Sequence, residues 1–263
     1  MAASDASVPI VDREARPAPV HRITRDDLRQ ALRQGVDDFA QKPSHIVFLV
    51  IIYPIVALIL SRLTFGYEVL PILFPLAAGF ALLGPVAAIG LYEFSRRRER
   101  GLPLSWVHAV GVVRSPAIRA IVGLGAVLAV LFLLWLLVAW LIFEATLGTA
   151  PQSVGGFLGA VFGTGAGWTM IVVGNGVGFL FAVVALAISW ISFPMIIDRH
   201  VDALTAVATS LRAVRKNPVS AATWGIVVVI GLVLGSIPFF VGLAITLPVL
   251  GHATWHVYRK VVG

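Results

Sequence analysis

The sequence predicts an all-α, polytopic membrane protein with six transmembrane helices, arranged as three hairpins that are each preceded by an amphipathic interfacial helix. Three observations lead to this fold class: long apolar segments, the placement of the basic residues, and a pattern repeated before alternate segments. Apolar residues make up 59% of the 263 residues and charged residues only 13%, against roughly 25% in an average soluble domain. With a mean hydropathy of +0.94, the chain has too little polar surface for a protein surrounded by water.

Six segments are long and apolar enough to cross about 30 Å of hydrocarbon as helices. They are residues 46–65, 70–92, 117–143, 174–197, 219–237 and 239–257. We expect a disordered N-terminal tail over residues 1–22 and a single transmembrane domain over residues 23–263.

The basic residues lie almost entirely in alternate connections. Of the twenty Lys and Arg residues, all but Arg62 precede the first segment, follow the last, or lie in the second-to-third and fourth-to-fifth connections, if Arg119 at the very start of the third segment is counted with the connection before it. Lys and Arg in short loops stay on the cytoplasmic side, so this pattern predicts a multi-pass protein of a bacterial-type inner (cytoplasmic) membrane with both termini in the cytoplasm. Because the basic residues are dispersed in this way, we expect no nucleic-acid binding, despite the net charge of +7.

A short amphipathic stretch stands before each odd-numbered segment and ends in a basic residue that is followed within two positions by proline. The three endings are Lys42-Pro43, Arg114-Ser115-Pro116 and Lys216-Asn217-Pro218. Such stretches suit helices in the headgroup plane, with basic side chains facing anionic phospholipid headgroups. We interpret the pattern as an internal repeat; the alternative is three independent signals for entering the membrane.

Several short motifs also resemble a known family. In chain order they are Gly84-Pro85, Gly90-Leu91-Tyr92-Glu93, Ser95-Arg96-Arg97, Asp198-Arg199, Asn217-Pro218 and Gly251-His252-Ala253-Thr254-Trp255-His256. From about residue 28 to residue 260 the chain resembles a bacterial family of six-helix integral membrane proteins catalogued as a domain of unknown function. The resemblance implies the fold and leaves the function open.

Some members of that family are labelled as similar to cytochrome c oxidase subunit I. That label would imply twelve spans with haem-ligating histidines distributed among them. This chain has six predicted spans, and its six histidines all lie on or near the predicted cytoplasmic side. We therefore do not carry the label over as an activity.

Polar residues at the cytoplasmic ends of the even-numbered segments form the candidate site. His252 and His256 are four residues apart, so they share a helix face and could reach one metal ion or a haem edge. Further candidate ligands near the same helix ends are Glu93, Asp198 and His200. Two ligands do not make a site, and we favour a polar cluster that ties the three hairpins together. Its predicted members are Glu93, Asp198, Arg199, His252 and His256. We predict no cofactor, and we expect that replacing both His252 and His256 with alanine lowers the thermal stability in detergent.

Two other features are candidates for helix contacts or for a pathway. Gly155, Gly159, Gly163 and Gly167 recur at intervals of four in the connection between the third and fourth segments, and small residues at this spacing let membrane helices approach closely. The alternative is a weakly structured outer loop. Asn175 is the one amide side chain inside a predicted span, which is too little to define a substrate pathway.

The sequence shows no Ser-His-Asp arrangement, HExxH, phosphate-binding loop or paired intramembrane carboxylates, so we predict a protein that is not an enzyme. The first hypothesis is an accessory or assembly subunit of a larger membrane complex, for example a respiratory one, in contact with other membrane proteins or with copies of itself. One alternative is a small-solute transporter or channel, because prolines in three spans could break helices around a site. The other is a lipid-binding, membrane-shaping protein that acts through its basic interfacial helices.

Overall fold

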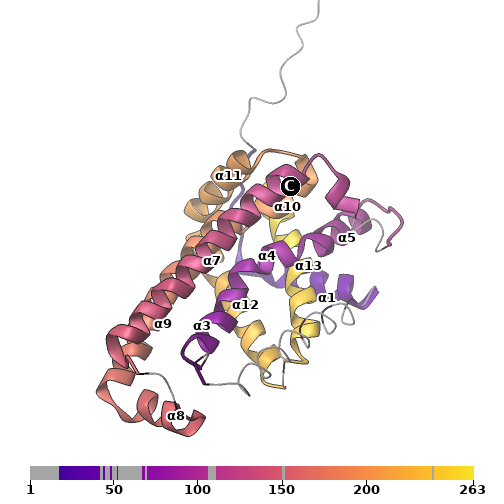
Figure 1. Cartoon of the computed structure of the whole chain (residues 1–263). Coiled ribbons are helices and arrows are strands. Elements are labelled where there is room, and N and C mark those ends of the chain that lie inside the picture. The colour runs from indigo at the N-terminus through magenta and orange to yellow at the C-terminus, as the bar shows by residue number, and fades with distance from the viewer. Residues whose placement is uncertain are drawn as a thin grey trace, which may run out of the picture.

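The computed structural model describes residues 18–41, 44, 48, 52, 67–68, 70–105, 111–149, 152–238 and 240–263. The first predicted span apart from Phe48 and Ile52, most of the predicted tail and the middle of the second predicted interfacial stretch lie outside these residues. Within the described ranges the chain is helical and has no strand (Figure 1). The helices are α1 (Arg25–Gln41), α3 (Leu70–Phe80), η1 (Ala81–Leu83), α4 (Gly84–Ala87), α5 (Ile89–Glu99), η2 (Val112–Arg114), α7 (Ile118–Thr146), α8 (Val154–Gly163), α9 (Gly165–Ser189), α10 (Ser192–Arg199), α11 (Ala203–Lys216), α12 (Pro218–Ser236) and α13 (Leu243–Val262).

Four helical stretches of the described chain are long and apolar enough to cross a membrane. They are Leu70–Glu99, Ile118–Thr146, Gly165–Arg199 and Pro218–Ser236. They correspond to the second to fifth predicted spans, so the prediction of an all-helical protein with several membrane-spanning helices is confirmed. The predicted sixth span is helix α13, which is not among the four because its second half is polar, with two histidines and two basic residues. The total of six spans therefore stays a prediction.

The fourth span begins earlier than predicted. Its helix starts at Gly165 rather than at residue 174, because the Thr164 side chain accepts a hydrogen bond of 3.0 Å from the Gly167 amide and so caps the helix. Ser153 caps α8 in the same way through the Gly156 amide. The connection between the third and fourth predicted spans, for which a weakly structured outer loop was one alternative, therefore contains the short apolar helix α8 and the beginning of α9.

Helices that follow one another in the chain lie side by side. Helix α7 contacts α9, and α12 contacts α13; Figure 1 shows α7 and α9 running together from the region of α10 and α11 to α8. These are the helix pairs of the predicted second and third hairpins. The first hairpin includes residues outside the described chain, so the threefold repeat stays a prediction.

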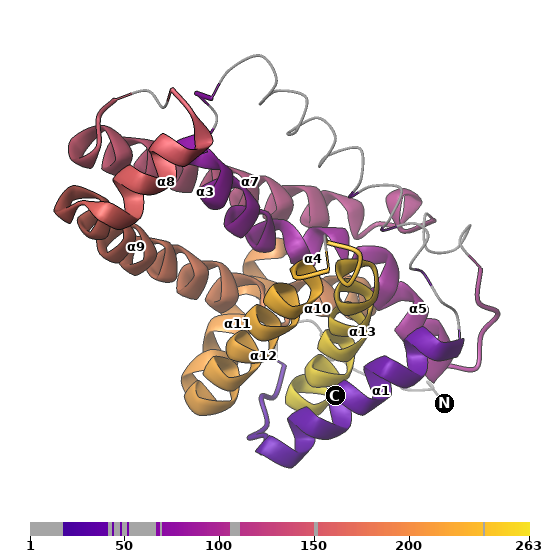
Figure 2. The ribbon, with the colours of Figure 1, turned by 90° about the horizontal axis from the view of Figure 1, so that it is seen from below.

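Several helices lie together at one end of the molecule, which we call the basic end: α1, α5, α10, α11, the start of α12 and the second half of α13 (Figure 2). The largest fully buried side chains here include Trp224, Trp255, Tyr258 and Phe193. In contrast, only 6–24% of the residues in the most apolar window of each of the four spans are buried. The apolar surface that remains is suited to lipid or to other membrane helices.

The two described amphipathic helices are buried in different ways. Helix α1 packs along α13 and buries Leu28, Ala31 and Gly35 against the protein. Helix α11 instead buries small and hydroxyl side chains and leaves Leu204 83% exposed. Both helices were predicted to lie against headgroups, but much of the apolar face of α1 is covered by protein, because α13 offers it a complementary surface.

The extended residues 18–24 cross the start of α12 and are held there by Asn217. The Asn217 Oδ1 accepts a hydrogen bond of 2.9 Å from the Ile23 amide, and its Nδ2 donates to the His21 carbonyl at 2.9 Å. Asn217 is 5% exposed, and its bond with the Ile23 amide is buried, so this amide does not lie unpaired away from water. Pro218 follows in the first turn of α12, where no amide partner is lost.

Replacing Asn217 with alanine is expected to lower the free energy of unfolding by about 1–3 kcal/mol, because two backbone groups lose their partners. We also expect faster tryptic cleavage after Arg22 in the released segment, measured by mass spectrometry of timed digests. The matched control is Asn175→Ala, which removes an exposed amide that bonds only to its own helix. Equal cleavage rates in the two variants would contradict this role for Asn217.

Candidate functional site

The first polar group at the basic end is centred on the buried carboxylate of Asp38. We call it the Asp38 cluster; it consists of Asp38, Ser95, Arg98, His252 and His256, drawn from α1, α5 and α13. Ser95 and Arg98 each donate to Asp38, and His256 Nε2 lies 2.9 Å from the Asp38 Oδ2. One carboxylate therefore joins three helices.

Folding brings Asp38 to this position because it lies on the buried face of α1, in helical register with Leu28, Ala31 and Gly35. The capping box formed by Thr24 and Asp27 begins α1 and fixes that register: Asp27 accepts from the Thr24 amide at 2.8 Å, and the Asp27 amide donates to the Thr24 hydroxyl at 3.2 Å. Asp38 is consequently only 5% exposed.

The residues around Asp38 stabilise its ionised form. Burial raises the pKa of the carboxyl group, but hydrogen bonds from His256, Ser95 and Arg98, together with the charge of His256, outweigh burial and leave the pKa below its ordinary value. The carboxylate is therefore ionised at neutral pH, and it neutralises cationic groups at a buried position.

Ser95, His252 and Asp38 are the residue types of a hydrolytic triad, but they are connected in a different order. The Ser95 hydroxyl donates to Asp38, so the His252 Nδ1, 2.8 Å away, must donate to the Ser95 oxygen. In a triad the histidine stands between the serine and the carboxylate and takes the serine proton. Ser95 is also only 1% exposed, so the hydroxyl is arranged as a structural link rather than as a nucleophile.

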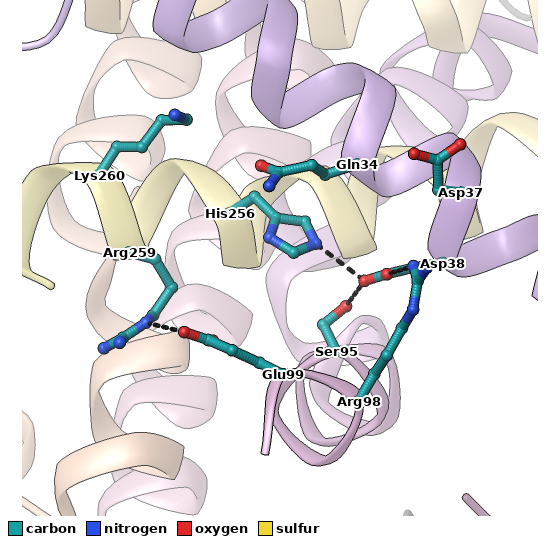
Figure 3. Close-up of a pocket in the computed structure, with 9 residues that line it drawn as sticks. All are labelled: Gln34, Asp37, Asp38, Ser95, Arg98, Glu99, His256, Arg259 and Lys260. Carbon is teal, nitrogen blue, oxygen red and sulfur yellow. Dashed lines mark hydrogen bonds and ion pairs between the residues drawn. The ribbon is translucent and has the colours of Figure 1, made fainter. Parts of the chain in front are cut away.

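A cavity of about 600 Å³ adjoins this cluster between α1, α5 and α13 (Figure 3). Its lining includes three acidic residues and three basic residues, which makes its formal charge close to zero. Most of these charges are already paired with one another; Arg259, for example, lies 2.9 Å from Glu99. Asp37 differs, because its exposed side chain makes none of the contacts drawn in Figure 3.

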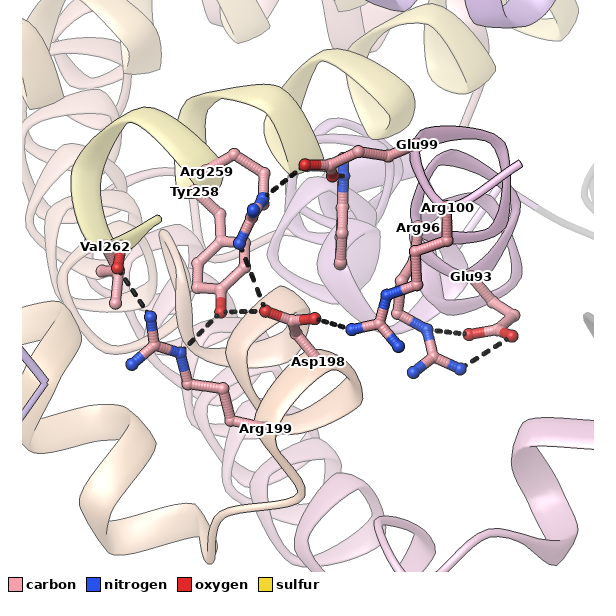
Figure 4. A network of polar contacts seen from close by, with 10 residues as sticks. Glu93, Arg96, Glu99, Arg100, Asp198, Arg199, Tyr258, Arg259 and Val262 are labelled. Atoms are coloured by element: carbon pink, nitrogen blue, oxygen red, sulfur yellow. Dashed lines mark hydrogen bonds and ion pairs between the residues drawn. The ribbon is translucent and has the colours of Figure 1, made fainter. Parts of the chain in front are cut away.

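A second polar group joins α5, α10 and the end of α13 (Figure 4). We call it the Asp198 cluster; it consists of Glu99, Arg100, Asp198, Arg199, Tyr258 and Arg259. Asp198 accepts from Arg100 at 2.7 Å and from the Tyr258 hydroxyl at 2.8 Å. Arg199 donates to the Val262 carbonyl at 2.6 Å, which places a cation at the C-terminal end of α13, where the helix dipole favours it.

The predicted site residues are thus divided among separate groups. His252 and His256 join the Asp38 cluster, whereas Asp198 and Arg199 belong to the Asp198 cluster. Glu93 is in neither, because it pairs with Arg96 on its own helix at 2.7 Å. His200 ends α10 in the left-handed conformation, with φ of 54°, and is exposed.

These clusters include residues that were not predicted from the sequence, among them Asp38, Ser95, Arg98 and Glu99. A signal for Asp38 was present, since it is a carboxylate within the apolar stripe of the first amphipathic stretch. A charge at such a position calls for a buried partner. No comparable pattern marks Ser95 or Glu99 among the charged residues that follow the second span.

Both histidines belong to a network of hydrogen bonds and ion pairs. One nitrogen of each ring is already in a hydrogen bond, and Arg98 occupies the Asp38 carboxylate that would complete a ligand set. Among the described residues, no group of three or more histidine, aspartate or glutamate side chains is placed to bind a metal. The absence of a cofactor therefore stays a prediction.

The apolar helices agree with a similarity to a family of membrane proteins. Residues 73–198 match the family described as predicted integral membrane protein DUF2189. The resemblance inferred from the sequence is therefore confirmed over just under half of the chain. No curated protein and no solved structure matches the chain.

The region that matches DUF2189 runs from α3 to the end of α10. It contributes Ser95 and Arg98 to the Asp38 cluster and Asp198 to the Asp198 cluster. The partners from α1 and α13, among them the histidine pair that suggested the family most specifically, lie outside the matched residues. Both clusters therefore join the DUF2189 region to the remainder of the chain.

The four spaced glycines are placed differently from one another. In α8, Gly155, Gly159 and Gly163 have no atom within 4 Å of the position of an added Cβ. The predicted close helix contact is not made at these three residues within the described chain. Gly167 does approach its neighbours, since its Cβ would lie 2.1 Å from the Val161 carbonyl oxygen at the turn between α8 and α9.

Proposed function

We propose that this chain is a non-enzymatic accessory or assembly subunit of a larger complex in a bacterial-type inner membrane, with both termini in the cytoplasm. The observation that carries the proposal is the exposed amide side chain of Asn175 near the middle of α9. Its Nδ2 donates to the Ile171 carbonyl of the same helix at 2.8 Å, and its Oδ1 has no hydrogen-bond partner among the described residues. An unpaired polar atom in hydrocarbon is costly, so this amide favours a position against another protein helix.

The surface around Asn175 suits such a contact. Val172 and Phe179 lie one turn away on the same face and are 68% and 66% exposed. The adjacent Gly176 has open space at its Cβ position, which would let a second helix approach closely. Helix α9 is also the least buried of the four spans, with 6% of its most apolar window covered.

The transporter alternative receives less support from the geometry. The cavity of about 600 Å³ at the basic end includes His256, but its lining includes neither Glu93 nor Asn175. The charges that line it are mostly satisfied by one another, as in a structural network, and a substrate would have to displace those pairs.

Purification from native membranes in a mild detergent tests the proposal. We expect a different polypeptide to co-purify at a fixed ratio, and Asn175→Leu to lower its yield several-fold without lowering the thermal stability of the isolated chain. The matched control is Thr169→Val, because Thr169 is an exposed polar residue on another face of α9 that bonds to the Gly165 carbonyl. The control should retain the partner.

Cross-linking supplies an independent check, because the chain contains no cysteine. A single cysteine introduced by Val172→Cys should form an adduct with the partner in membranes, whereas Leu133→Cys on α7 should not. A clean monomer, or an adduct that contains two copies of this chain alone, would contradict the accessory role.

A further inference from the structure

A second cavity, of about 340 Å³, lies between α1 and α12 at the basic end. Its floor is apolar and is formed by Leu28 and Leu32 of α1 together with Trp224 and Val227 of α12. Leu28 and Trp224 are almost fully buried, whereas Leu32 and Val227 are half-buried and line the open side. A groove of this composition binds hydrocarbon in preference to a soluble polar molecule.

The rim of the groove carries two arginines. Arg25 and Arg29 are one turn apart on α1, and both side chains line the cavity. Within the described part of the chain Arg25 makes no ion pair. Arg29 pairs with Asp26 at 3.0 Å, but both side chains are exposed, by 76% and 85%, so this pair is weak and can be exchanged for a stronger anion. Two guanidinium groups at adjacent positions match a phosphate.

The groove also lies at the depth in the membrane where lipid headgroups meet hydrocarbon. Helix α12 is a candidate span that starts at Pro218, so Trp224 lies about 9 Å along the helix from that end. Hydrogen bonds from the Ser220 hydroxyl to the Ile23 carbonyl, and from the Ile23 amide to Asn217, hold the beginning of α1 beside that same end. The arginines are therefore at headgroup level, and the apolar floor continues towards the hydrocarbon.

We propose that this groove binds one anionic phospholipid, with its phosphate between Arg25 and Arg29 and the first part of an acyl chain against Leu28, Leu32, Trp224 and Val227. The charge of the rim selects an anion, and the apolar floor selects a lipid over free phosphate. The site does not depend on the accessory role proposed above, since it lies on α1 and α12 and not on α9, and either proposal can fail alone.

Native mass spectrometry of the purified, delipidated full chain tests this site by titration with phosphatidylglycerol and with phosphatidylcholine. We expect one tightly bound phosphatidylglycerol, and roughly thirtyfold weaker binding in the R25Q/R29Q double variant, with little change for phosphatidylcholine. Both arginines are exposed, so this variant should fold, and an unchanged melting temperature without lipid checks that it does. The matched control is R212Q/R215Q, which removes the same charge from α11 and should bind phosphatidylglycerol as the unsubstituted chain does.

Three results would overturn the proposal. The first is unchanged affinity of R25Q/R29Q for phosphatidylglycerol, and the second is an equal loss in R212Q/R215Q, which would indicate a general charge effect. The third is binding of inorganic phosphate, titrated in the same way, that is as tight as binding of phosphatidylglycerol, because the apolar floor would then have no role in binding.

Discussion

Replacing Asp38 with alanine is expected to lower the free energy of unfolding by about 3–5 kcal/mol. The substitution leaves the Arg98 guanidinium without its carboxylate and removes hydrogen-bond partners from Ser95 and His256. Because Asp38 joins α1 to both α5 and α13, we expect the loss to appear as a single, lower melting transition. Tryptophan fluorescence in detergent measures it, since the chain has seven tryptophans.

The adjacent residue provides the control for this prediction. Asp37 has the same side chain but is exposed, so Asp37→Ala should change the free energy of unfolding by less than about 0.5 kcal/mol. Similar losses in the two variants would show that the charge of α1, and not the buried network, is responsible.

The contribution of Asp38 should also depend on pH in a defined direction. The ordinary pKa of an aspartate side chain is about 3.9. The pKa of Asp38 in the folded chain lies below that ordinary value. Its stabilising effect is therefore fully present above that ordinary value and is lost as the pH falls through the lower folded value. The difference in melting temperature between the unsubstituted chain and Asp38→Asn should shrink in strong acid, as the carboxylate takes up a proton.

Adding a single methyl group by Gly35→Ala is expected to destabilise the chain by about 1–3 kcal/mol. The new Cβ would lie 2.7 Å from the Ala253 Cβ and 2.7 Å from the Val249 carbonyl oxygen. Since that oxygen belongs to the backbone of α13, the two helices must separate, which also strains the contact between His256 and Asp38. Thermal unfolding in detergent measures the loss.

The same methyl group placed in open space should have the opposite effect. Gly159 lies within α8 and has no atom within 4 Å of its Cβ position. Gly159→Ala should therefore be neutral or stabilise the chain by up to about 1 kcal/mol, because alanine is the better helix former. If Gly35→Ala changes the thermal stability no more than Gly159→Ala does, α1 and α13 do not approach each other as closely as described here.

The histidine pair illustrates how far a spacing argument reaches. Because His252 and His256 are four residues apart, they were correctly predicted to lie on successive turns of one helix, α13. Their partner is Asp38 on α1 rather than Glu93 or Asp198. Depth in the membrane suggested the latter two, but depth restricts one coordinate only, and residues at equal depth can be far apart.

The amphipathic stretches illustrate a second limit. Helices α1 and α11 have similar sequence patterns, and both begin with side-chain caps. Only the structure distinguishes them, because α13 covers the apolar face of α1 while Leu204 of α11 remains exposed. A helical period identifies an apolar face but not the surface that it contacts.

The sequence by itself determined that this is a helical membrane protein, where its second to fifth spans run, and where its charges are concentrated. Those properties are sums over neighbouring residues, because the free energy of transferring a segment into hydrocarbon is set by its own composition. Only the tertiary structure decided that Asp38 is the carboxylate shared by α5 and α13, that Glu93 pairs within its own helix, and that Arg25 and Arg29 stand at the rim of an apolar groove. Each of these depends on distances between residues far apart in the chain, which neither hydropathy nor helical period specifies.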